Sequence, residues 1–142
     1  MPKHYWLCKS EPMKYSFADL MRDKKTRWDG VRNHLAAKHL KAMQLGDECF
    51  FYHSNEGLAI VGLMKVIKTA YPDPSDATGK FVCVDVAPVK AAKNPLTLAE
   101  IKTHPVLGQM VFVKQSRLSV SPVNLAEARL VLALIDRSAL SS

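Results

Sequence analysis

The chain has 142 residues, of which 48% are hydrophobic, and this length suits one compact domain with a single core. No apolar run approaches the roughly 20 residues that a membrane-spanning helix needs, and the start "MPKHYWLC" lacks the basic-then-apolar order of a secretory signal. We therefore expect no membrane association and an intracellular location: cytoplasm or nucleoid in a bacterium, nucleus in a eukaryote.

Lysine and arginine number 20 against 13 aspartates and glutamates, and the net charge of +7 makes a polyanion the natural partner to consider. The basic residues are scattered, so any basic surface must be assembled by the fold. Cys8, Cys49 and Cys83 each lie in an apolar run and are predicted to be reduced core residues. Neither the cysteines nor the five histidines have the spacing of a metal site, and no cofactor is expected.

The first predicted elements are a strand and a short helix. The stretch "HYWLC" is aromatic and β-favouring, and it is followed by a loop that contains Pro12. The stretch "YSFADL" predicts a helix start, because Ser16 can cap the helix and Asp19 can complete a capping box.

A second helix and a hairpin follow. Ala36, Leu40 and Met43 form an apolar stripe at helical spacing before Gly46. From residue 47 the pattern predicts a strand through residue 53, a turn at "NEG", and a return strand in which Gly62 indicates a bulge or a close approach of the backbone.

The C-terminal half predicts a strand at 81–89 after a turn-rich loop, a brief helix capped by Thr97, further strand from residue 110, and a final helix after Asn124. Strands and helices do not alternate regularly, which indicates an α+β domain and not a parallel α/β one. We expect about five strands that curl into a small barrel, with no internal repeat and no linker.

Four motifs in chain order carry a resemblance to a known family: "YWLCKSEP", "WDGVRN", "LGDECFFYHSN" and "IVGLMKVIKTAYPD". They resemble the EVE domains, which belong to the PUA-like barrels, from Tyr5 to about Asp73 and more loosely to near Val123. The resemblance implies one EVE domain over residues 1–142, with a small curled mixed β-barrel of five or six strands and flanking helices. EVE domains are similar to the YTH readers of methylated adenine in RNA.

The resemblance implies a binding protein that accepts one flipped, modified base, 5-methylcytosine or 5-hydroxymethylcytosine in DNA. Flipping costs a few kcal/mol, and stacking on an aromatic side chain returns about 1–3 kcal/mol per base. Trp28 is the candidate stacking wall, in the place of a cage tryptophan of the YTH domains; alternatively it plugs the barrel mouth. Trp6 lies in the middle of a predicted strand and is expected in the core.

Trp28 is expected in a polar loop that contains Gly30, and the other candidate residues follow strands or lie in the same loop. The base-pocket candidates are Trp28, Ser10, Glu11, Gly30, Val31, Asn33, Tyr52, His53 and Ser54, and the phosphate-binding candidates are Lys9, Arg32 and Arg117.

Structural alternatives remain open for several of these residues. Ser10 and Glu11 can hold their own loop, Arg32 can pair with an internal carboxylate such as Glu11 or Asp29, and Asn33 can cap the second helix. Alternation along a strand places Tyr52 and Ser54 on one face and His53 on the other, so they cannot all line one cavity without a bulge.

Two rival functions remain. One is an RNA-binding PUA-like module that acts on tRNA or rRNA, since the sequence does not reveal whether a 2′-hydroxyl is contacted. The other is a cleft for a small molecule or free nucleobase. Catalysis is not expected: Ser54 and His53 are adjacent on a strand and point apart, and no phosphate-binding glycine loop occurs.

Overall fold

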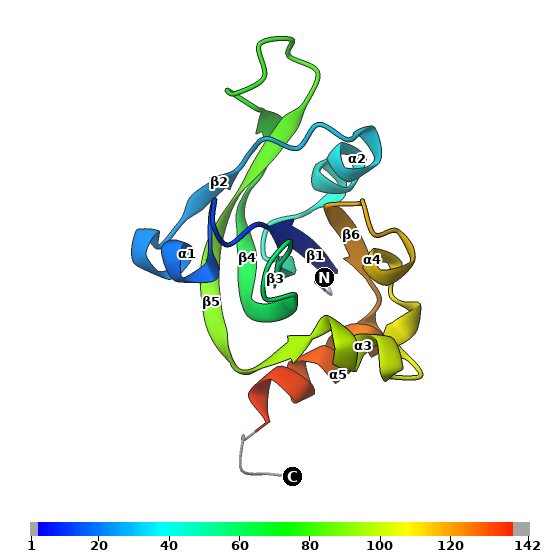
Figure 1. Cartoon of the computed structure of the whole chain (residues 1–142). Coiled ribbons are helices and arrows are strands. Elements are labelled where there is room, and N and C mark those ends of the chain that lie inside the picture. Colours follow the sequence, from blue (N-terminus) through cyan, green and yellow to red (C-terminus); the bar gives the residue numbers. More distant parts are fainter. Residues whose placement is uncertain (1–2, 138–142) are drawn as a thin grey trace.

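The computed structural model describes residues 3–137, which form one six-stranded mixed sheet (Figure 1). The strands are β1 (Tyr5–Ser10), β2 (Thr26–Trp28), β3 (Glu48–His53), β4 (Ala59–Pro72), β5 (Val82–Thr97) and β6 (Val120–Val123). Their order is β2-β5-β4-β3-β1-β6, with β1 and β3 parallel and the other neighbours antiparallel. This confirms the predicted mixed α+β fold, but β2 and β6 lie at opposite edges, so the curled sheet is not a closed barrel.

Short helices surround the sheet: α1 (Phe17–Asp23), α2 (His34–Ala42), α3 (Leu98–Thr103), α4 (Val111–Lys114), α5 (Leu125–Asp136) and the 3₁₀ turn η1 (Leu107–Gln109). The predicted caps are confirmed, since the side chains of Ser16, Thr97 and Asn124 each accept a hydrogen bond from the third helical residue. No helix between residues 3 and 137 is long and apolar enough to cross a membrane.

Alternating side chains divide the core into two clusters, one on each face of the sheet. In β3, Phe51 joins the cluster that α1 and α2 cover, whereas Phe50 and Tyr52 join the cluster that α5 covers. The final helix, α5, contributes Ala128 and Val131 to this second cluster. The three cysteines are buried and reduced, which confirms their predicted core role.

Gly62 explains how α1 reaches the first cluster. The register of β4 against both neighbouring strands shifts beside this residue, which is the predicted bulge. The predicted close approach is also present, because a Cβ atom on Gly62 would lie 2.4 Å from Cζ of Phe17. The aromatic ring therefore occupies the space that any side chain at position 62 would need.

Two sequence predictions are wrong. Residues 111–114 form α4 and not a strand, and β6 begins only at Val120; a short apolar run does not distinguish strand from helix when burial decides its conformation. Met110 and Phe112 are both buried in the cluster beneath α5. Trp28 was placed in a loop, but it ends the short strand β2 and pairs with Val84 of β5.

The variant Gly62→Ala should lower the free energy of unfolding by about 1–3 kcal/mol, because the added methyl group overlaps the Phe17 ring. Urea denaturation measures this loss. Phe17→Leu removes the overlapping ring, so the double variant should be more stable than the sum of the two single effects predicts. Strict additivity would contradict the proposed contact.

Candidate functional site

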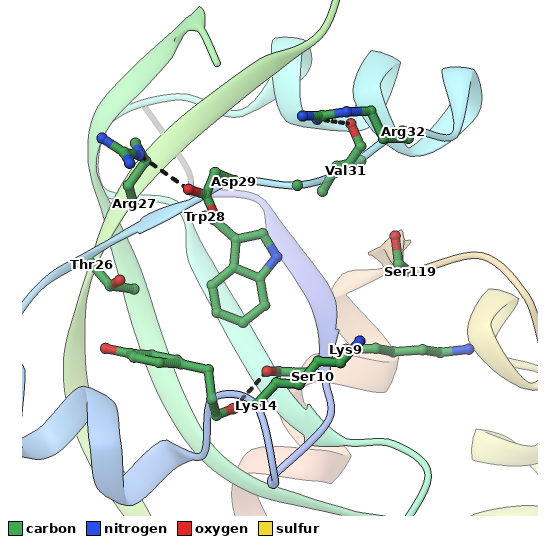
Figure 2. Close-up of a pocket in the computed structure, with 12 residues that line it drawn as sticks. Lys9, Ser10, Lys14, Thr26, Arg27, Trp28, Asp29, Val31, Arg32 and Ser119 are labelled. Carbon is green, nitrogen blue, oxygen red and sulfur yellow. Dashed lines mark hydrogen bonds and ion pairs between the residues drawn. The ribbon is translucent and has the colours of Figure 1, made fainter. Parts of the chain in front are cut away.

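A cavity of about 440 Å³ opens between the end of β1, the start of α1, β2 and the loop that leads into α2 (Figure 2). We call it the Trp28 cavity. Its volume lies within the range of about 300–1,000 Å³ that is typical of small-ligand sites. It is therefore large enough for a nucleobase with part of its sugar.

Trp28 and Tyr15 give the cavity an aromatic lining. Figure 2 shows the indole of Trp28 directed into the cavity, while its edge-to-face contact with Phe51, 5.3 Å between ring centroids, anchors it in the core. Trp28 and Trp6 are both 7% exposed, but only Trp28 lines the cavity. Trp6 is a core residue, as predicted, and its Nε1 donates to Asp47 at 3.0 Å. Trp28 can therefore both fill the open end of the curled sheet and form a wall of the cavity, so the two roles considered for it are compatible.

Basic side chains outnumber acidic ones around the cavity. Lys9, Lys14, Arg27 and Arg32 line it together with a single carboxylate, Asp29, which accepts a hydrogen bond from Arg27 Nε at 3.2 Å. This surplus of positive charge favours an anionic ligand.

Lys9 differs from the other cations because its side chain is partly enclosed. Its Nζ donates to the backbone oxygen of Ser116 at 2.8 Å and lies 5.7 Å from the centroid of the Phe112 ring. Burial lowers the pKa of this ammonium group. Lys9 is therefore a positioned cation, whereas Lys14 is an exposed one.

A buried carboxylate that the sequence analysis did not select holds the loop behind Trp28. Asp73, only 2% exposed, accepts hydrogen bonds from Gly30 N at 2.8 Å, from Arg32 Nη1 at 3.0 Å, and from Ser75 N and Oγ at 2.7 and 2.6 Å. Gly30 has a φ of +79°, which favours glycine and directs its N–H toward Asp73. The partner of Arg32 is thus Asp73, and neither Glu11 nor Asp29.

The hydrogen bonds to Asp73 dominate its ionisation. Burial alone would raise its pKa, but the donors from Ser75, Gly30 and Arg32 outweigh burial and hold the pKa well below its usual value. The carboxylate is therefore charged at neutral pH and fixes the backbone that follows Trp28.

Five of the predicted site residues line the cavity with Trp28: Lys9, Ser10, Gly30, Val31 and Arg32. Ser10 also holds the loop, because its Oγ donates to the backbone oxygen of Tyr15 at 2.6 Å. Glu11 does not line the cavity; its carboxylate pairs with Lys14 at 3.1 Å, and its backbone oxygen accepts from the N–H groups of Lys14 and Tyr15.

The other predicted residues lie elsewhere. Asn33 and Arg117 line a neighbouring hollow of about 300 Å³, and Asn33 caps α2 by accepting from Ala36 N at 2.9 Å. His53 supports α1, since its Nε2 accepts from Phe17 N at 3.1 Å. Burial lowers the pKa of this imidazole.

Tyr52 and Ser54 line a third hollow and not the Trp28 cavity. The cause is the alternation along β3, which directs Tyr52 toward the core cluster beneath α5 and Phe51 toward the cluster that contains Trp28.

Six residues that line the cavity were missed as site residues: Lys14, Tyr15, Thr26, Arg27, Asp29 and Ser119. The signal for Tyr15 and Lys14 was their position directly after "KSEP", in the turn that closes onto α1. Within residues 3–137 no three His, Cys, Asp or Glu side chains are grouped to hold a metal ion.

The variant Asp73→Asn should lower the free energy of unfolding at pH 7 by about 2–4 kcal/mol, because it weakens the network around a buried charge. The folded-state pKa is depressed, so this stabilisation is complete above the ordinary aspartate pKa of about 3.9 and is lost as the pH falls below it.

Urea denaturation between pH 7 and pH 3 should therefore show the stabilities of the two proteins converging in acid. Asp29→Asn is the control, since the Asp29 carboxylate is partly exposed and paired with Arg27 at the surface, and it should change stability far less. A gap between wild type and Asp73→Asn that stays constant down to pH 3 would contradict the assigned role.

Comparison with known proteins identifies relatives over nearly the whole chain. The EVE domain family matches residues 4–134. Human thymocyte nuclear protein 1 is 38% identical over 168 residues, covering 94% of this chain and 74% of that protein. The solved structure of Rpa0253 from Rhodopseudomonas palustris is 50% identical, with a TM-score of 0.88 and 92% of each chain covered.

Two structures of protein–nucleic-acid complexes are also similar. The crystal structure of human THYN1 with 5-methylcytosine-containing DNA has a TM-score of 0.87 at 37% identity, covering 96% of this chain and 99% of that one. The YTH domain of Zygosaccharomyces rouxii MRB1, solved with N6-methyladenosine RNA, has a TM-score of 0.60 at 14% identity over 96% of this chain and 88% of that one, a likeness of fold alone. The family match and the identity to these relatives show that the chain belongs to the EVE domain family.

Proposed function

We propose that this protein is a nucleic-acid reader that binds a single flipped, modified base in the Trp28 cavity. The observation that carries the proposal is the combination of an aromatic wall with a surplus of cations around one cavity of about 440 Å³. The THYN1 complex with 5-methylcytosine-containing DNA supports DNA as the polymer and 5-methylcytosine as the base. The role is binding and not catalysis.

The energetics of base flipping fit the residues present. Extracting a base from its stack costs a few kcal/mol, and an aromatic contact returns about 1–3 kcal/mol. Trp28 can supply this contact without losing much side-chain freedom, because Phe51 already holds its ring. The Asp73 network likewise fixes the loop in advance, so little ordering is needed when the ligand binds.

The polar groups that line the cavity match the hydrogen-bonding groups of a cytosine edge in kind. A carboxylate suits the exocyclic amino group of cytosine, and in this fold the carboxylate that lines the cavity is Asp29 and not the predicted Glu11. The hydroxyl groups of Ser10 and Thr26 offer further hydrogen bonds. Val31 is a nearly buried apolar contact for a 5-methyl group.

The cations serve different parts of the ligand. Arg32 is engaged by Asp73 and Ser75 and holds the loop, so its predicted phosphate role is secondary. Lys14 and Lys9 remain for phosphate, together with Arg117 in the neighbouring hollow. Phosphate contacts position the strand, whereas the base contacts supply specificity.

The decisive experiment is a binding titration with matched oligonucleotides that carry cytosine, 5-methylcytosine or 5-hydroxymethylcytosine, as DNA and as RNA. We expect the wild-type protein to bind DNA more tightly than RNA, and to bind DNA with a modified cytosine more tightly than DNA with cytosine. Trp28→Leu retains an apolar side chain but removes the stacking face, and should weaken binding of the preferred strand by about 5- to 150-fold.

Trp6→Phe is the matched control, because Trp6 is as buried as Trp28 but does not line the cavity. The Trp6→Phe protein should bind the preferred strand with the affinity of wild type. Thermal unfolding of each variant checks the fold. An affinity that is blind to base modification would contradict the reader function. A preference for RNA would favour the RNA-binding module, and tight binding of the free nucleobase would favour the small-molecule cleft.

The salt dependence of binding tests the phosphate contacts separately. Lys14→Ala should reduce the slope of log affinity against log salt concentration by about 0.7 to 0.9, the value for one lost phosphate contact. Lys41→Ala, on the exposed side of α2, removes the same charge without touching the cavity and should leave the slope unchanged. Equal effects of the two variants would show that Lys14 makes no specific contact.

A further inference from the structure

The third hollow, of about 230 Å³, lies beside the Trp28 cavity and shares Lys9 with it. It is formed where the end of β3 meets α3 and α4, and its lining includes Tyr52, Ser54, Leu58 and Phe112. We call it the Tyr52 hollow. Its volume is below the range of about 300–1,000 Å³ for drug-sized ligands, so it suits a single flat ring system.

The Tyr52 side chain provides a polar group that has no partner among residues 3–137. Tyr52 is only 3% exposed, yet its hydroxyl makes no hydrogen bond to any residue in the described range 3–137. In that range the only completely buried side-chain polar atom without a partner is Ser121 Oγ. The Tyr52 hydroxyl therefore retains access to solvent, and Tyr52 is one of the residues that line the hollow.

The remainder of the lining combines apolar surface with positive charge. Phe112 packs against Tyr52 with 5.0 Å between ring centroids, and Leu58 is partly exposed. Lys9 lies at the boundary with the Trp28 cavity, 5.7 Å from the centroid of Phe112, and Lys102 also lines the hollow. An apolar surface beside two cations suits a base that is attached to phosphates.

We propose that the Tyr52 hollow is a second base subsite, which binds the nucleotide next to the flipped base on the same strand. This inference rests on the proposed function. One base would occupy the Trp28 cavity, its neighbour would lie against Leu58 and Leu98, and Lys9 would contact the phosphate between them. The Tyr52 hydroxyl would form a hydrogen bond with the edge of the second base. A purely apolar occupant would leave this hydroxyl unpaired.

A cycle of protein and ligand variants tests this subsite. The ligand is the modified DNA strand that the protein prefers, together with two forms in which the 5′ or the 3′ neighbour of the modified base is abasic. The protein is compared with Tyr52→Phe, which removes only the hydroxyl, and with Tyr5→Phe, the same change in a tyrosine outside the hollow.

One of the two abasic strands should bind the wild-type protein about 5-fold or more weakly, because the neighbouring base's apolar contact and its hydrogen bond are lost. Tyr52→Phe should bind the intact strand about 3- to 10-fold more weakly, the cost of one hydrogen bond, and should show no further loss on that abasic strand. Tyr5→Phe should behave as wild type on all three strands.

Two results would overturn the inference while leaving the proposed function intact. In the first, neither abasic strand binds more weakly; in the second, Tyr52→Phe has no effect or the same effect on intact and abasic strands. In both, wild type would still prefer the modified base and Trp28→Leu would still lose affinity. Absence of any modification preference would instead overturn the proposed function and the subsite with it.

Discussion

The alternation of side chains along β1 and β3, the parallel pair of the sheet, decides which residues can act together. Trp6, Cys8 and Phe51 face the core cluster beneath α1 and α2, whereas Leu7 and Tyr52 face the cluster beneath α5. Because successive residues of a strand point to opposite faces, "YHSN" at the end of β3 is divided between two environments. The Trp28 cavity and the Tyr52 hollow, which share Lys9, follow from this division, since each opens at the edge of one cluster.

A second constraint joins parts of the chain that are distant in sequence. Asp73, directly after β4, accepts hydrogen bonds from the backbone of Gly30 and the guanidinium of Arg32. These bonds connect the β4–β5 turn to the loop that follows Trp28. A buried carboxylate is unfavourable unless donors surround it, so the loop conformation and the charge stabilise each other. The loop after Trp28 is in this way held by several hydrogen bonds, which would limit the entropy lost if a ligand binds there.

Local chemistry explains which features could be predicted from the sequence. Helix starts at Ser16, Thr97 and Asn124 depend on residues three positions apart, and the bulge at Gly62 follows from a glycine within a strand, so both were predicted correctly. The pairing of Arg32 with Asp73 spans 41 residues and has no local signature. The prediction of a strand at α4 failed for a related reason, because the burial of Met110 and Phe112 beneath α5 is a tertiary effect. To predict that Tyr52 lines a separate hollow, one must know where α3 and α4 lie, and the sequence pattern of β3 does not reveal this.

The two lysines nearest the cavity differ in hydration, and this difference separates attraction from orientation. Lys14 is largely exposed, so its charge is well hydrated and acts mainly through long-range attraction that salt screens. Lys9 has already lost part of its hydration, as the downward direction of its pKa indicates, and its Nζ is held by Ser116 O. A phosphate at Lys9 would displace little water from the cation and would meet a fixed donor, so the contact would set the register of the strand. Such a division fits a site where the polymer is attracted by charge but aligned by one residue between two base-sized hollows.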